Sequence, residues 1–230
     1  SKHFFLLDIN GLKVDFDSEK FLLGTPAIGN LDEDADMEVV FSGYSSGNMI
    51  WALNPDGSSV DGFPIDLGAE KVKIGVALAD FNDNGRDDIV VGTDSFKLHL
   101  FYDDGSEAPG FPYQVGDKIQ SAPVILDVDD QKVIFAGSND EYLYAVNADG
   151  SLRFSLPTTN KVLNSPAFLK HNNTFYIFFS DDSGILYAVD SNGNALEGWP
   201  VDADATISKS VAFSDLDGDN EAEVIAVTEM

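Results

Sequence analysis

Three nine-residue segments of the chain carry oxygen-bearing side chains at the same spacing. They span residues 30–38, 80–88 and 215–223, and each has Asp, Asn or Glu at its first, third, fifth and ninth positions. The seventh position is free to offer a backbone carbonyl. Oxygen-only ligands in a tight loop suit a hard cation with the size and coordination number of calcium. His and Cys are absent from all three segments, which makes zinc and copper poor candidates.

Two alternatives compete with a calcium site of this kind. An EF-hand loop also begins D-x-[DN]-x-[DN], but it needs a bidentate Glu at position 12 and a helix on each side. Counting from Asp80 gives Val91 at position 12, and counting from Asp217 gives Thr228, so the EF-hand is excluded. The second alternative is a metal-free turn, because Asp, Asn and Gly form turns without any ion.

An internal repeat supplies the elements that position these segments. Four apolar runs end in an Asx-Gly turn, at Gly57, Gly105, Gly150 and Gly193. A Gly-Phe-Pro or Gly-Trp-Pro triplet follows three of these turns. Equivalent strands of small residues recur every 43 to 50 residues, beginning at Ala27, Ala77, Val124, Ala167 and Ala212. Periods of this length are typical of propeller blades.

Within each unit the hydrophobic pattern has the period of two that strands require. Short β-branched and aromatic runs, such as 39–41, 89–91 and 133–135, are bounded by Gly, Asp, Asn and Ser. The sequence offers no amphipathic segment with a helical period. Each unit therefore predicts four short strands, which make one blade.

The chain as a whole predicts an all-β fold, a single-domain β-propeller of about five four-stranded blades. The complete units are approximately residues 25–73, 74–120, 121–164 and 165–208. The fifth unit is split, since residues 209–230 match a first half and residues 1–24 match a second half. Pairing of the two halves would close the ring and remove its sheet edges. The alternative is that the chain is a piece of a larger propeller.

The acidic segments, each followed by an apolar strand and in two cases by a glycine (Gly43 and Gly92), resemble the FG-GAP repeats of integrin α-chain propellers and the related VCBS repeats of bacterial surface proteins. In that family, side chains at positions 1, 3, 5 and 9 and the carbonyl at position 7 hold calcium. The resemblance implies up to three Ca²⁺ ions. Their ligands would be Asn30, Asp32, Asp34, the carbonyl of Asp36 and Glu38; Asp80, Asn82, Asn84, the carbonyl of Arg86 and Asp88; and Asp215, Asp217, Asp219, the carbonyl of Glu221 and Glu223. The units containing residues 127–131 and 170–174 lack such a segment and are more similar to quinoprotein-type blades.

Composition narrows the classes of partner. The chain has 13 Lys and Arg against 40 Asp and Glu, a formal charge of −27. Phosphate backbones and anionic membrane surfaces would repel it, so we expect it to bind neither nucleic acid nor membrane surfaces. No apolar run approaches the roughly 20 residues of a membrane span, so we expect no membrane insertion. The absence of Cys excludes disulfides, thiolate zinc sites and cysteine nucleophiles. Its apolar content of 43% is sufficient for a packed core.

The segment Gly43-Tyr44-Ser45-Ser46-Gly47 matches the G-x-S-x-G nucleophile elbow. That motif works on a strand-to-helix turn with a His base and an acid nearby. Here a strand pattern follows, and turn-forming residues occupy the same slot in the sibling units. The pattern therefore favours a hairpin turn, and no catalytic residue is predicted.

The expected function is that of a non-catalytic, calcium-binding module of a secreted or cell-surface protein, which binds a protein or a polysaccharide. The alternative is part of an extracellular polysaccharide-degrading enzyme, a lyase or hydrolase, since propellers host many chemistries. Millimolar extracellular calcium and a cysteine-free acidic surface predict an extracellular, cell-surface or periplasmic location. We expect a monomer.

Overall fold

The computed structural model describes residues 2–45, 47–172 and 174–229. The described residues form strands and turns without a helix, which confirms the expected all-β class. It follows that this part of the chain holds no helix capable of crossing a membrane.

Four antiparallel sheets have four strands each, hydrogen-bonded in sequential order as in propeller blades. Blade 1 consists of β3 (Ala27–Gly29), β4 (Glu38–Ser42), β5 (Asn48–Leu53) and β6 (Ile65–Gly68). Blade 2 consists of β7 (Val76–Ala79), β8 (Asp88–Gly92), β9 (Lys97–Phe101) and β10 (Tyr113–Gln114). Blade 3 consists of β11 (Val124–Val128), β12 (Gln131–Gly137), β13 (Tyr142–Asn147) and β14 (Leu152–Pro157). Blade 4 consists of β15 (Ala167–His171), β16 (Thr174–Ser180), β17 (Ile185–Asp190) and β18 (Val201–Asp202).

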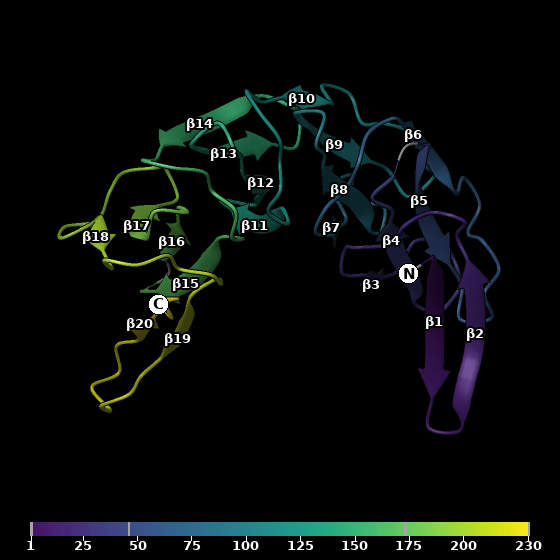
Figure 1. Cartoon of the computed structure of the whole chain (residues 1–230), viewed down its shortest axis with the longest axis horizontal. Helices are drawn as coiled ribbons and strands as arrows, with labels where there is room; N and C mark the ends of the chain where they lie inside the picture. The colour runs from purple at the N-terminus through teal and green to yellow at the C-terminus, as the bar shows by residue number, and fades with distance from the viewer. Residues whose placement is uncertain (1, 46, 173, 230) are drawn as a thin grey trace.

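Two further sheets have two strands each. β1 (His3–Asp8) pairs with β2 (Gly11–Asp17), and β19 (Ala212–Ser214) pairs with β20 (Glu223–Ile225). Figure 1 shows the sheets following an open arc, with these two pairs at its opposite ends. Among the described residues the two pairs belong to separate sheets, so the half-units do not close the ring by pairing with each other.

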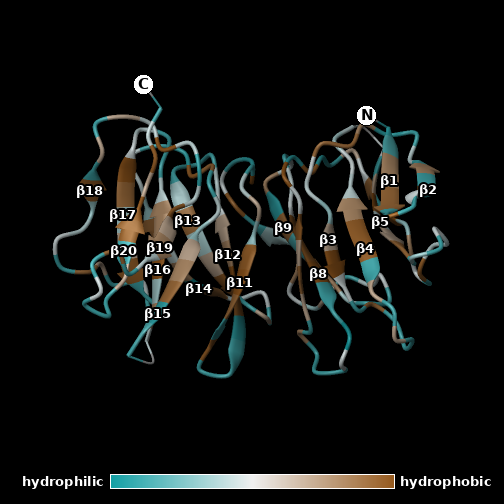
Figure 2. Cartoon of the chain, turned by 90° about the horizontal axis from the view of Figure 1, so that it is seen from below, coloured by the Kyte–Doolittle hydropathy of each residue, from teal (hydrophilic) through white to brown (hydrophobic). Residues whose placement is uncertain are grey.

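The hydrophobic core lies between successive sheets, because the middle strands of each blade present alternate side chains to both neighbours. In β4, Val40 belongs to a cluster that includes Ile89 of blade 2. The adjacent Phe41 packs on the other side, against Trp51 and Phe16. β4 and β8 are buried at every position, which explains why their sequences are continuous rather than alternating apolar runs. Figure 2 shows this distribution, with apolar strands inside and polar loops at the edges.

The two repeated sequence signatures contact each other from one blade to the next. Gly62 of a Gly-Phe-Pro triplet lies against the backbone of Asp104 in the Asx-Gly turn of blade 2. Gly110 lies in the same way against the backbone of Asp149 in blade 3. A Cβ at either glycine would overlap the carbonyl oxygen of that turn, so the triplet glycine is a blade-packing residue.

The two blades without an acidic segment join their first and second strands by tight turns. In blade 3, Val128 pairs with Gln131, and the intervening Asp129 and Asp130 have φ of 53° and 61°. Positive φ at both central residues is typical of a type I′ hairpin. In blade 4, His171 pairs with Thr174, and Asn173 lies outside the described residues. Neither connection has the length of a nine-residue loop.

Candidate metal centres

The three acidic segments occupy equivalent places in the fold. Loop 1 (residues 30–38) joins β3 to β4, loop 2 (80–88) joins β7 to β8, and loop 3 (215–223) joins β19 to β20. Each therefore connects the first and second strands of a blade or half-blade, and its ninth residue begins the second strand.

In each loop, a hydrogen bond between positions 2 and 9 fixes the side chain of the ninth residue. The backbone N–H at position 2 donates to the carboxylate at position 9 in all three loops. These bonds join Leu31 to Glu38 Oε2 (2.6 Å), Phe81 to Asp88 Oδ2 (2.7 Å) and Leu216 to Glu223 Oε2 (2.6 Å). The position 9 side chain is thereby aimed into the loop rather than towards solvent.

Asx turns curve the backbone around the same interior. The side-chain oxygen at position 5 accepts the N–H of position 7, the residue whose carbonyl is a predicted ligand. These bonds are Asp36 to Asp34 (2.7 Å), Arg86 to Asn84 (2.8 Å) and Glu221 to Asp219 (2.8 Å). At position 3, Asp32, Asn82 and Asp217 accept the N–H of position 5 in the same manner. The same three hydrogen bonds thus recur among the predicted ligand residues of all three loops.

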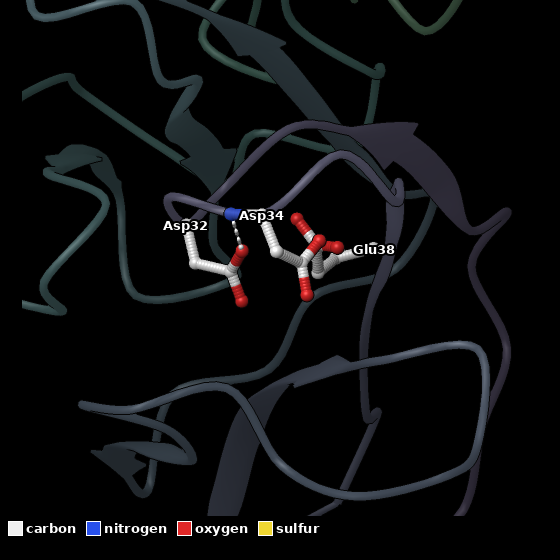
Figure 3. A group of neighbouring side chains, drawn as sticks. All are labelled: Asp32, Asp34 and Glu38. Carbon is white, nitrogen blue, oxygen red and sulfur yellow. Dashed lines mark hydrogen bonds between the residues drawn. The ribbon is translucent and has the colours of Figure 1, made fainter.

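Loop 1 brings three carboxylates together. Oxygen atoms of Asp32, Asp34 and Glu38 all lie within 4.8 Å of one another. Figure 3 shows the three carboxylates gathered at one side of the loop, with the N–H of Asp34 bonded to Asp32. Such a group of anionic oxygens is the arrangement that a hard divalent cation requires.

Two oxygens of loop 1 test whether these residues fit a cation. Glu38 has none of its surface exposed, and its Oε1 is buried without a hydrogen-bond partner. The Oδ1 of Asn30, at position 1, is likewise buried and unpartnered. Burial raises the pKa of Glu38, and the nearby charges of Asp32, Asp34 and Asp36 add to this effect. Buried acceptors without donors are costly, and a cation bound in the loop offers such oxygens a partner. The loop 1 residues therefore fit calcium.

Loop 3 holds a second cluster of carboxylates. Oxygen atoms of Asp215, Asp217 and Glu223 lie within 4.8 Å of one another. Asp215 also accepts the N–H groups of Gly218 (2.6 Å) and Asn220 (3.0 Å), which holds position 1 against the loop backbone. Asp215 and Asp217 are exposed, because loop 3 lies on a half-blade at the end of the arc.

Loop 2 carries less negative charge at its predicted ligand positions. Asp80 and Asp88 supply its carboxylates, and the other two side chains are the amides of Asn82 and Asn84. Asp80 accepts the N–H of Gly85 at 2.7 Å, as Asp215 does for the equivalent residue of loop 3. Asp88 is fully buried.

The environment of Asp88 includes an acid that the sequence analysis missed. Burial raises the pKa of Asp88 to about 6, with Asp103 and Asp80 adding to the shift and the N–H groups of Phe81 and Asp103 opposing it. Asp103 lies in the Asx-Gly turn of the same blade, where it accepts the side-chain amide of Asn84 (2.8 Å) and pairs with Arg86 Nε (2.7 Å). The sequence did indicate a special role for Asp103, because the equivalent turns of the other blades have no acid at this position.

The loops differ in backbone conformation. Loops 2 and 3 have positive φ at positions 4 and 6: Asp83 (58°), Gly85 (84°), Gly218 (84°) and Asn220 (71°). Glu33 and Ala35 hold these positions in loop 1, and neither belongs to the described residues with positive φ. Side chains other than Gly, Asn and Asp disfavour that region, which explains why loop 1 follows a different path.

The G-x-S-x-G segment is a hairpin connection, as its neighbours in sequence predicted. It lies between β4 and β5, and a strand rather than a helix follows it. Ser46 is outside the described residues. Without the strand-to-helix turn, Ser45 lacks the exposed position that a nucleophile elbow provides.

No protein-family model and no curated protein sequence matches this chain. Solved structures of β-propeller proteins do match its fold. BBS1N, in complex with ARL6DN, superimposes with a TM-score of 0.68 at 17% identity, covering 99% of this chain and 69% of its own. BamB from Moraxella catarrhalis gives a TM-score of 0.67 at 15% identity, covering 89% of this chain and 56% of its own.

The V. cholerae biofilm matrix protein Bap1 gives a TM-score of 0.66 at 16% identity. The match covers 98% of this chain and 38% of Bap1. The chain thus spans about two thirds of BBS1N, and less than two thirds of BamB and of Bap1. At these identities the similarity establishes the propeller fold, in agreement with the repeat analysis.

Proposed function

We propose that this chain is a non-catalytic, calcium-stabilised propeller module of a protein outside the cytoplasm, secreted, surface-attached or periplasmic, and that it binds a protein or polysaccharide partner. The observation that carries the calcium assignment is the buried, unpartnered Oε1 of Glu38, whose carboxylate clusters with those of Asp32 and Asp34, together with the buried, unpartnered Oδ1 of Asn30 in the same loop. A buried carboxylate oxygen without a donor is stabilised by a cation.

The chemistry of the donor set favours calcium over other metals. The predicted ligands are oxygens alone, and the segments contain neither His nor Cys. Carboxylates, amides and carbonyls around one loop give the flexible, oxygen-rich shell that calcium accepts. Mg²⁺ demands a smaller octahedral shell and keeps several waters, so it should compete weakly.

The proposed binding role rests on the fold and on what its structural neighbours bind or form. BBS1N was crystallised in complex with ARL6DN, and Bap1 is a biofilm matrix protein. Propellers present inter-strand loops on rigid blades, which is how scaffolds commonly hold ligands. A location where calcium is millimolar is consistent with loop sites of modest affinity.

The test of calcium binding is the melting temperature of the whole chain, measured in excess EDTA, in about 2 mM calcium and in the same concentration of magnesium. A cation that binds only the folded state stabilises it by mass action, by about 2.7 kcal/mol at a hundredfold excess over Kd. We expect calcium to raise the melting temperature well beyond magnesium. Identical melting curves in calcium and EDTA would overturn the proposal.

A further inference from the structure

Loops 1 and 2 lie on neighbouring blades and are joined by hydrogen bonds. The backbone N–H of Asp87 donates to the carbonyl oxygen of Asn30 at 2.6 Å. The N–H of Asn30 donates in return to Asp87 Oδ2 at 3.0 Å. The side-chain Nδ2 of Asn30 also donates to the carbonyl oxygen of Gly85 at 3.3 Å.

Two further features make this contact close. Arg86 Nη1 of loop 2 lies 3.5 Å from Glu33 Oε1 of loop 1. The residue before Asn30 is Gly29, where a Cβ would lie only 2.5 Å from Asp87 Oδ2. A glycine at this position therefore lets the carboxylate of Asp87 reach the backbone of loop 1.

The two sides of this contact, Asn30 and residues 85–87, lie in two of the loops predicted to bind calcium. Asn30 is position 1 of loop 1, and its amide is oriented by donating Nδ2 to loop 2, which leaves the buried Oδ1 free to accept a cation. The segment that it holds, residues 85–87, contains the position 7 carbonyl of loop 2 and leads directly into Asp88 at position 9. Ordering either loop thus orders a ligand of the other.

We propose that calcium binding in loop 1 and in loop 2 is positively coupled through the Asn30–Asp87 contact, so that filling one site raises the affinity of the other. The inference rests on the proposed calcium-binding function. Coupling of this kind is reciprocal, and an effect of about fivefold or more on affinity is typical. Loop 3 lies at the far end of the arc from loop 1 and is independent of it.

The test is a calcium titration of the full chain followed by NMR, read separately at the amides of Leu31, Phe81 and Leu216, the position 2 residues of the three loops. The variant Asp80→Asn weakens loop 2, and Asp215→Asn changes the equivalent ligand of loop 3. We expect Asp80→Asn to move the midpoint at Leu31 to calcium concentrations about fivefold higher or more. Asp215→Asn should leave the midpoint at Leu31 where it is in the unaltered chain.

A second variant addresses the contact itself. Asp87 is at position 8 of loop 2 and is a predicted ligand of neither site, so Asp87→Ala should raise the midpoints at both Leu31 and Phe81. The coupling would be overturned, with calcium binding intact, if Asp80→Asn moved the midpoint at Phe81 but not the midpoint at Leu31, and Asp87→Ala did not raise both midpoints. Amides that do not shift with calcium in the unaltered chain would instead overturn the proposed function, and the coupling with it.

Discussion

The N–H of Leu31 and the carboxylate of Glu38 form a 2.6 Å hydrogen bond between positions 2 and 9 of loop 1. This bond uses Oε2 and leaves Oε1 buried without a partner. The two oxygens of Glu38 therefore have different roles: Oε2 closes the loop, and Oε1 faces the loop interior. The closing bond involves only protein groups, so this bond can form without a cation.

Replacing Glu38 by Gln tests these two roles separately. The Gln carbonyl can still accept the N–H of Leu31, but the anionic oxygen is lost. Burial and the charges of Asp32, Asp34 and Asp36 disfavour the Glu38 carboxylate in the metal-free protein. We therefore expect Glu38→Gln to be at least as stable as the unaltered chain in EDTA, and to gain less from calcium, by up to about 3 kcal/mol at a hundredfold excess over Kd.

Asp36→Asn is the matched control for Glu38→Gln. It removes one negative charge from the same loop, but Asp36 is predicted to ligate through its carbonyl and its side chain is exposed. Urea unfolding with and without calcium should show near-normal calcium stabilisation for Asp36→Asn. Equal losses in the two variants would mean that overall charge, rather than the Glu38 oxygen, determines the calcium effect.

The triplet glycines allow a matched test of blade packing. Gly110 has φ of +88° and Gly198 has φ of +85°, so Ala is strained at both, by about 1 kcal/mol or somewhat more. A Cβ at Gly110 would also overlap the carbonyl oxygen of Asp149, whereas a Cβ at Gly198 would meet nothing within 4 Å. We expect Gly110→Ala to be the more destabilising by a further 1–3 kcal/mol or so in urea unfolding. Similar losses at the two positions would contradict the packing role.

The half-buried hydroxyl of Tyr144 offers a third measurement. Tyr144 Oη donates to Asp140 Oδ2 at 2.7 Å, and the same oxygen accepts the N–H of Gly116 at 2.6 Å. Burial raises the pKa of Tyr144, and the hydrogen bond to Asp140 raises it further. Tyr144→Phe should cost about 1–3 kcal/mol of unfolding free energy, because the bond is to a carboxylate. Tyr142→Phe, in an exposed side chain of the same strand, should change it by less than about 0.5 kcal/mol.

Most of the fold could be predicted from the sequence because each blade is specified locally. The period-two strands, the Asx-Gly turns and the repeat length all lie within one unit, and the tight turn at Asp129 and Asp130 was visible as a missing loop. What the sequence could not supply are contacts between blades. The role of the triplet glycines and the bonds from Asn30 to loop 2 depend on how separate units are stacked. The contact of Asp103 with Arg86 lies within blade 2, but it joins two loops that are distant in the repeat pattern. The open arc is likewise a property of the assembled sheets.

Glu70 contacts several charged and polar side chains of blade 2. Glu70 lies 3.0 Å from Nε2 of the buried His99, 2.5 Å from Lys97 Nζ, and accepts the hydroxyl of Thr93 at 2.8 Å. The other ring nitrogen of His99 lies 2.6 Å from Glu107. Burial raises the pKa of Glu70, but the hydrogen bonds from Lys97, His99 and Thr93 outweigh it and hold the pKa below its ordinary value of 4.5.

A carboxylate with a depressed pKa contributes stability above its unfolded-state pKa and loses it as the pH falls through the folded-state value. The difference in unfolding free energy between the unaltered chain and Glu70→Gln should therefore be greatest near neutral pH and shrink as the pH falls below 4.5. Glu197→Gln, at an exposed side chain, serves as the control and should give a small difference at every pH. Urea unfolding of the three proteins across this range measures the effect. A difference for Glu70→Gln that stays constant or grows on acidification would mean that the folded state does not favour the ionised carboxylate.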